Sequence, residues 1–185
     1  MIKFITLTLF NFVLLSQLAI ATDSDANIQN TATWQKTEYG VSFSLKQLLT
    51  DQVNAFYIGR GFTLEQIKPY ANTCVYTVIL RNDNTSDRID FVRHHWRILH
   101  DGKSQAPKKN QDWLTQWKIE GVTASALIGF KFAQLPERQS YAPNGDWNQG
   151  MLSIALPVGS QFDLVLNWHS QKQPYQMVLT GVNCV

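Results

Sequence analysis

The segment Cys-Val-Tyr-Thr-Val-Ile-Leu at residues 74–80 is dense in apolar and β-branched side chains, the composition of a buried β-strand. It is followed by a turn-rich stretch, Asn-Asp-Asn-Thr-Ser-Asp, at residues 82–87. Residues 89–100 then form a second strand-like segment. This order predicts an antiparallel β-hairpin with a loop longer than the tightest type.

Segments on both sides of this hairpin have the period of two that is typical of a strand with one wet face. Tyr39, Val41, Phe43 and Leu45 alternate with small or polar residues. Further strands are predicted at residues 123–133, 151–156, 161–169 and 175–184. Residues 45–56 also have apolar side chains at helical spacing, but the aromatic residues and two glycines of 53–62 favour a strand there.

Helical signals are few. Thr63 and Gln66 form a capping-box pattern that predicts a short helix over residues 64–71, and the four-residue spacing of Trp113 and Trp117 indicates one helical turn at 112–117. Residues 101–112 and 136–150 are predicted loops. The sequence therefore predicts a mainly β protein: an antiparallel β-sandwich, immunoglobulin-like or a partly open barrel, with one or two short helices.

The start of the chain predicts export. Met-Ile-Lys precedes an apolar run that ends in Ala19-Ile-Ala21, which are the three parts of a secretory signal peptide at residues 1–21. An uncleaved anchor helix is the alternative, but Asn11, Ser16 and Gln17 interrupt the run. We expect a flexible lead-in at 22–33, one domain at 34–185, no membrane span after cleavage, and a periplasmic or secreted location.

Charge argues against some partners. The chain of 185 residues has a formal net charge of +2, and removal of Lys3 with the signal lowers it to +1. A near-neutral protein with scattered basic residues offers no electrostatic reason to bind nucleic acid or an anionic membrane.

Cys74 and Cys184 are the two cysteines of the sequence. In an exported chain an even pair predicts a disulfide bond, and the absence of a C-x-x-C motif disfavours a redox or metal pair. Two free thiols remain the alternative.

The segment Pro-Asn-Gly-Asp-Trp-Asn-Gln-Gly at residues 143–150 is the most unusual local sequence. Asp146, Trp147 and Asn148 have the chemistry to contact a protein or glycan partner, although a capped turn is the simpler interpretation. Trp113 and Trp117 lie beside predicted loops and are further candidates. Arg60, close to several aromatic residues, is either a ligand anchor or a stacked structural arginine.

A metal site is the alternative hypothesis. His94 and His169, with Met151 as a soft ligand, are candidates for binding copper or zinc. If residues 91–100 are one strand, His94 and His95 point to opposite faces. A hydrogen-bonded core histidine is the simpler interpretation of His94.

Catalysis is disfavoured because the chain has neither a G-x-S-x-G nucleophile motif nor a glycine-rich phosphate loop. The sequence thus predicts an exported, non-catalytic β-sandwich without a cofactor, which binds a protein or glycan through residues 136–150 and nearby aromatic side chains.

Overall fold

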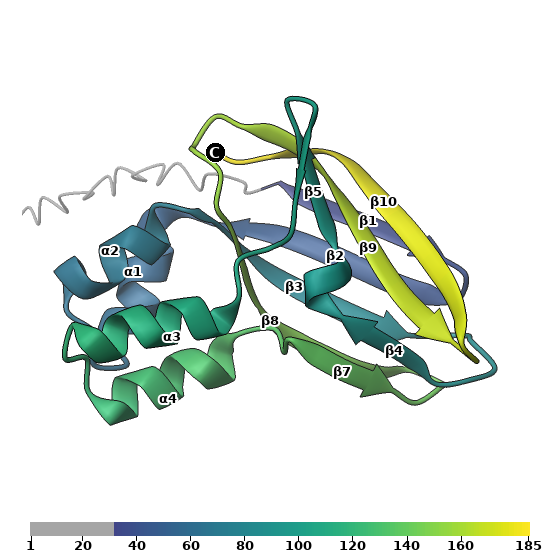
Figure 1. Cartoon of the computed structure of the whole chain (residues 1–185), viewed down its shortest axis with the longest axis horizontal. Helices are drawn as coiled ribbons and strands as arrows, with labels where there is room; N and C mark the ends of the chain where they lie inside the picture. The colour runs from purple at the N-terminus through teal and green to yellow at the C-terminus, as the bar shows by residue number, and fades with distance from the viewer. Residues whose placement is uncertain (1–31) are drawn as a thin grey trace, which may run out of the picture. The chain divides into compact units, whose positions relative to one another are not determined.

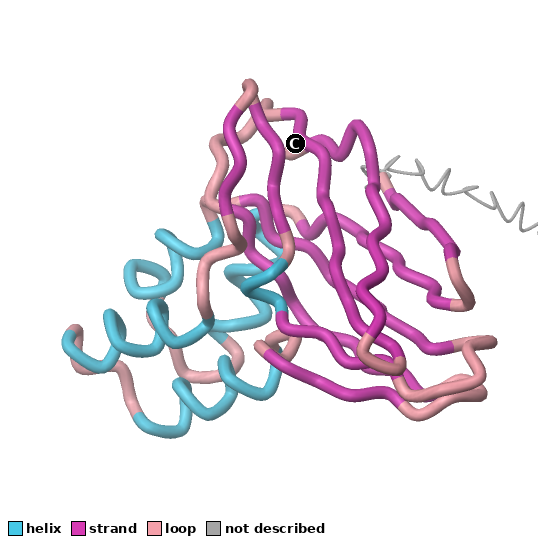
Figure 2. Tube along the Cα trace, turned by 45° about the vertical axis from the view of Figure 1, so that its right-hand side comes forward, coloured by secondary structure: helices cyan, strands magenta, loops and turns pink. Residues whose placement is uncertain are grey.

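The computed structural model describes residues 32–185, which form two antiparallel β-sheets and four short helices. The signal peptide and most of the lead-in predicted from the sequence lie outside these residues. Figures 1 and 2 show the four helices gathered at one end of the sheets. The predicted class, a mainly β sandwich, is confirmed, with four short helices where one or two were expected.

The first sheet has four strands. In spatial order they are β1 (Thr33–Glu38), β2 (Val41–Leu48), β3 (Cys74–Asn82) and β8 (Asp146–Ile154). The alternation in β2 buries Val41, Phe43 and Leu45 against the second sheet. In β3 both faces are buried at one end, because Tyr76 faces the second sheet while Val75 faces the helices.

The second sheet is built around the long strand β9. Its strands are β4 (Ile89–Val92), β5 (Arg97–His100), β6 (Lys103–Gln105), β7 (Arg138–Tyr141), β9 (Gln161–Ser170) and β10 (Gln173–Asn183). β10 pairs along one edge of β9, and β4 and β5 share the other edge. Residues 89–100 are therefore not one strand as predicted, since the 3₁₀ turn η1 (Arg93–His95) divides them.

The two sheets are joined on one side and open on the other. On the joined side β1 lies beside β10, and the Trp34 Nε1 and Lys36 Nζ groups donate to the carbonyl oxygens of Gly181 and Val178, at 3.2 and 3.1 Å. On the open side β7 and β8 follow each other in sequence but belong to different sheets. The architecture is a β-sandwich whose sheets are linked by side-chain hydrogen bonds along one side.

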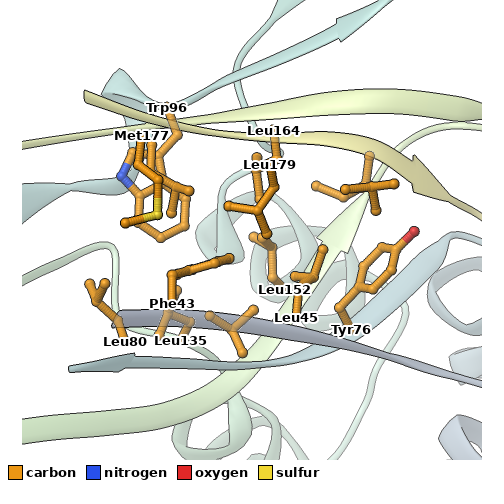
Figure 3. Packing of buried hydrophobic residues seen from close by; sticks show 14 of the residues in the cluster. Phe43, Leu45, Tyr76, Leu80, Trp96, Leu135, Leu152, Leu164, Met177 and Leu179 are labelled. Carbon is orange, nitrogen blue, oxygen red and sulfur yellow. The ribbon is translucent and has the colours of Figure 1, made fainter. Parts of the chain in front are cut away.

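Apolar side chains from both sheets fill the sandwich core (Figure 3). Phe43, Leu45 and Leu152 from the first sheet face Leu164 and Leu179 from the second. The predicted disulfide is confirmed: Cys74, at the start of β3, is bonded to Cys184, just after β10, with 5.4 Å between their Cα atoms. It ties the end of the chain to the first sheet.

The helices are α1 (Thr50–Ile58), α2 (Leu64–Ala71), α3 (Asn110–Ile119) and α4 (Ala124–Ala133). The prediction of α2 is confirmed, with Thr63 and Gln66 bonded to each other as a capping box. The predictions of strands at 53–62 and 123–133 are wrong. Val53 and Tyr57 are both buried and lie four residues apart, as do Ala126 and Phe130. Residues at this spacing lie on one face both in a strand and in a helix, so the spacing does not distinguish the two structures.

Together the helices cover the outer face of the first sheet at one end and create a second core there. We call it the helix-side core; its buried members are Val53, Tyr57, Phe62, Ile67, Tyr70, Ala71, Val75, Trp113, Trp117, Val122, Ala126, Phe130 and Met151. Within residues 32–185 no helix is both long and apolar enough to cross a membrane.

Candidate functional site

The stretch predicted as a loop at 136–150 consists mostly of β7, a turn and the first half of β8. Asp146 begins β8 and closes the turn, because its Oδ2 accepts a hydrogen bond from the backbone N–H of Ala142 at 2.9 Å. Asn144 and Gly145 in that turn have positive φ angles of 68° and 98°. Asp146 therefore has a structural role in the turn.

Trp147 is an exposed aromatic residue on β8, with 54% of its surface accessible. It pairs in register with Arg81 of β3. The neighbouring Leu80 is buried in the sandwich core, so Arg81 and Trp147 lie on the opposite, outer face of the first sheet. Asn148 lies on the inner side of β8 and is half-buried.

The outer edge of β8 has free backbone groups. The Met151 carbonyl accepts a bond from the N–H of Leu135 at 2.9 Å, so the backbone of Met151 points away from β3. Backbone direction alternates along an antiparallel strand, so the N–H and C=O groups of Trp147 and Gln149 also point away from β3. No residue in the described range 32–185 pairs with them.

A groove of about 370 Å³ lies beside this edge. Leu114 of α3 and Lys131 and Phe132 of α4 line it together with Pro136, Glu137 and Gln149. Phe132 is 81% exposed and is among the most exposed large apolar side chains of the described residues. The groove thus combines apolar side chains with the unpaired backbone of a strand.

The wall of the groove is held by a buried arginine. Arg93 is 1% exposed; its Nη1 donates to the Leu135 carbonyl at 2.8 Å, and its Nη2 donates to Asn110 Oδ1 at 2.8 Å and to Glu137 Oε1 at 2.7 Å. Burial lowers the pKa of Arg93, while the charge of Glu137 opposes that shift. The network joins η1, the start of α3 and residues 135–137 into one rigid unit.

A second buried network lies behind the groove. The Nε2 group of Gln134 donates to the Tyr57 hydroxyl at 2.6 Å, and the Tyr70 hydroxyl donates to Gln134 Oε1 at 3.1 Å. Burial raises the pKa of Tyr70 to about 12 and that of Tyr57 further, so both phenols are neutral. The Tyr57 hydroxyl also donates to Met151 Sδ at 3.2 Å, so the methionine sulfur lies within the helix-side core.

The residues proposed as metal ligands are not brought together. Met151 is buried on the outer side of the first sheet, whereas His169 is exposed on the outer side of the second. His94 lies in η1, where its ring centroid is 5.7 Å from that of His95, so the prediction that these histidines point to opposite faces is wrong. Within residues 32–185 no group of three or more His, Cys, Asp or Glu residues is placed to hold a metal ion.

The remaining candidates lie in the helix-side core or against it. Trp113 and Trp117 are 4% and 0% exposed and stack on each other with centroids 5.4 Å apart, so neither offers a surface to a partner. The guanidinium of Arg60 lies 3.3 Å from the ring centroid of Phe56, and its stem packs against Gly129. Of the two roles that the sequence allows for Arg60, ligand anchor or stacked structural arginine, this geometry fits the second.

Sequence reasoning missed Phe132, Arg93 and the free edge at Gln149. Phe132 was hidden by the prediction of a strand at 123–133. Taken as a helix, the same residues are apolar on all sides, which leaves Ile128 and Phe132 on the surface. No sequence signal marked the free edge, because it follows from the assignment of β7 and β8 to different sheets.

Comparisons of the chain with protein-family models, with curated proteins and with solved structures found no match.

Proposed function

We propose that this chain is an exported, non-catalytic protein that binds an extended segment of a partner polypeptide along the free edge of β8. The observation that carries the proposal is the unpaired backbone of Trp147 and Gln149 beside the groove. An incoming strand gains main-chain hydrogen bonds from such an edge, and its alternate side chains enter neighbouring pockets.

Export rests on two features. The first 21 residues have the pattern of a secretory signal, and the Cys74–Cys184 disulfide is typical of oxidising compartments. Both features fit a periplasmic or secreted protein.

The free edge is an unusual surface for a soluble protein to leave open. Edge strands are commonly protected by charged residues, proline or a covering element. Residues 146–150 contain no lysine, arginine or proline. Among residues 32–185 the outer edge of β8 is paired only at Met151, by residues 134–135. A binding role explains why the edge is left uncovered.

Two exposed aromatic side chains flank the edge and supply contact area. Trp147 lies on the strand itself, and Phe132 lies across the groove on α4. Buried aromatic anchors contribute most of the affinity in many interfaces. The edge is short, so we expect micromolar rather than nanomolar affinity.

The rigid wall of the groove also supports binding. The Arg93 network keeps Pro136 and Glu137 in place before the partner arrives. Preorganisation of this kind reduces the conformational entropy that is lost on association.

The test is a selection of random peptides displayed on phage against the immobilised protein. We expect peptides with alternating apolar residues, whose binding slows hydrogen exchange of the Trp147 and Gln149 amides. Gln149→Pro removes an outward N–H that the fold does not use, so it should leave the fold intact and abolish binding. Trp147→Ala and Phe132→Ala should each weaken binding.

Ile119→Ala is the matched control, because Ile119 is 83% exposed but does not line the groove. It should bind peptide as the parent protein does. Selected peptides that bind Gln149→Pro unchanged, or the absence of any selected peptide, would contradict the proposal.

A further inference from the structure

Three connections meet at the end of the sandwich opposite the helices (Figures 1 and 2). They are the β1–β2 turn at Tyr39–Gly40, the β9–β10 turn at Gln171–Lys172, and the β3–β4 loop at residues 83–88. Together they enclose a pocket of about 300 Å³, at the small end of the range for ligand pockets.

Three aromatic rings form one wall of this pocket. The ring centroids of Tyr39 and Tyr175 are 5.4 Å apart, and those of Trp168 and Tyr175 are 5.9 Å apart with nearly parallel planes. Trp168 is buried, whereas Tyr39 is 64% exposed. The Tyr39 ring is tilted by 54° to that of Tyr175 and by 55° to that of Trp168, so the rings leave no slot in which a cation would be surrounded. The exposed Tyr39 ring offers a face on which a flat ligand can stack.

Tyr39 is held in a backbone conformation that costs energy. Its φ is 52°, in the left-handed region that bulky side chains avoid. The turn is fixed in place because the Gly40 carbonyl accepts bonds from the N–H groups of Asp83 and Asn84, at 2.9 and 3.1 Å. A Cβ on Gly40 would lie 2.9 Å from the backbone of Asn84, so the close approach requires glycine. Tyr39 is therefore positioned by the loop that forms the opposite wall.

The polar side of the pocket is centred on Asp87. Its Oδ2 accepts hydrogen bonds from Ser86 Oγ and Gln171 Nε2, both at 2.6 Å. These bonds lower the pKa of Asp87, so the carboxylate is ionised at neutral pH. Its Oδ1 and the hydroxyls of Tyr39 and Tyr175 have no hydrogen-bond partner among residues 32–185, which leaves an acceptor and two hydroxyls for a ligand.

We infer that this pocket binds a single sugar ring. The C–H face of a pyranose stacks on the exposed ring of Tyr39, and its hydroxyls donate to Asp87 Oδ1 and exchange hydrogen bonds with the Tyr175 hydroxyl. The start of β8 lies near this pocket, because Asp146 pairs with Asn82 at the end of β3. Neither Trp147 nor Gln149 lines the pocket, so sugar binding does not require peptide binding at the β8 edge.

The experiment is saturation-transfer NMR on the whole protein with the methyl glycosides of glucose, mannose and galactose, with N-acetylglucosamine, and with choline as the cationic probe. We expect transfer to the ring protons of at least one sugar, with a Kd on the order of 1 mM for so small a ligand. Transfer to choline alone, or to none of the probes, would overturn the inference.

Tyr39→Asn separates binding from folding. Asparagine favours the left-handed conformation, so this variant should fold at least as stably as the parent while it loses the aromatic face. Sugar binding should fall at least tenfold in Tyr39→Asn and in Asp87→Asn, and should not change in Trp147→Ala. Equal binding by the parent protein and Tyr39→Asn would also overturn the inference.

Discussion

The sandwich core and the helix-side core share β3 but are built differently. The sandwich core is largely aliphatic, and its residues alternate along strands that face each other. The helix-side core is rich in aromatic side chains, several of which use a polar atom: Trp117 Nε1 donates to the Gln66 carbonyl at 2.8 Å, and Trp113 Nε1 lies 3.3 Å from Ser153 Oγ. Strand periodicity organises the sandwich core, which also contains ring contacts such as Phe43 with Trp96. The helix-side core has a larger share of aromatic side chains and no strand alternation across its helices.

The largest expected effect is loss of the disulfide. Cys74→Ser combined with Cys184→Ser opens a cross-link between residues 110 apart, which should lower the free energy of unfolding by about 4–5 kcal/mol in the chain-entropy model. Because Cys74 begins the strand that both cores share, we expect them to unfold together. Urea titrations followed by tryptophan fluorescence and by far-UV circular dichroism check this.

Coincident transitions at a lower midpoint support a shared dependence on β3. A loss below about 1 kcal/mol would show that the cross-link hardly constrains the unfolded chain.

Trp117→Ala should have nearly as large an effect, confined to the helix-side core. The centroid of the Trp117 ring lies 4.7 Å from that of Phe130 and 4.9 Å from that of Phe62. Removal of the ring leaves a cavity and takes away the hydrogen bond to the Gln66 carbonyl. We expect a loss of about 3–5 kcal/mol. Hydrogen exchange should accelerate in α2, α3 and α4 more than in β9 and β10.

Trp117→Phe is the matched variant, since it keeps an aromatic ring but not the N–H donor. It should lose less stability than Trp117→Ala. Equal acceleration of exchange in the helices and in β9 would show that the two cores are one cooperative unit.

The same contrast explains what the sequence predicts and what it does not. Most strands of the sandwich follow from alternation, as in Val41, Phe43 and Leu45, because each side chain's face depends only on its own position. The sequence predicts strands where α1 and α4 form, because two buried residues four positions apart share a face in a strand and in a helix. The four-residue spacing of Trp113 and Trp117 correctly predicts a helical turn, but it does not predict that both side chains are buried.

The binding surfaces are less predictable still. The exposure of Trp147 and the free edge at Gln149 depend on which strand lies beside β8, a property of topology rather than of local sequence. Arg93 lies within a strand-like pattern, and its burial depends on acceptors at Leu135 and Asn110, far away in the chain. Tyr39 meets Tyr175 only after the sheets stack.

A smaller effect is expected at the boundary between the cores, where the Arg93 network lies. Glu137→Ala removes the charged acceptor of a buried guanidinium, but Glu137 is 40% exposed, so water partly replaces the carboxylate. We expect a loss of about 2 kcal/mol, and a larger loss of about 3–4 kcal/mol for Arg93→Ala, which leaves several acceptors unpaired. Urea unfolding measures both.

The order of the two variants is the informative result. If Glu137→Ala destabilised the protein more than Arg93→Ala, the unpaired guanidinium would be the costlier defect, and the ion pair rather than the bonds to Leu135 and Asn110 would hold the groove wall.

The smallest effect on stability is expected for Trp147→Ala, which lies outside both cores. Trp147 is 54% exposed and makes no hydrogen bond through its ring among residues 32–185, so its loss should change the free energy of unfolding by less than about 0.5 kcal/mol. Urea unfolding of this variant and of Trp117→Ala compares an exposed indole with a buried one in the same domain. A loss above about 2 kcal/mol would mean that Trp147 supports the fold, and its exposure would then no longer count in favour of a binding role.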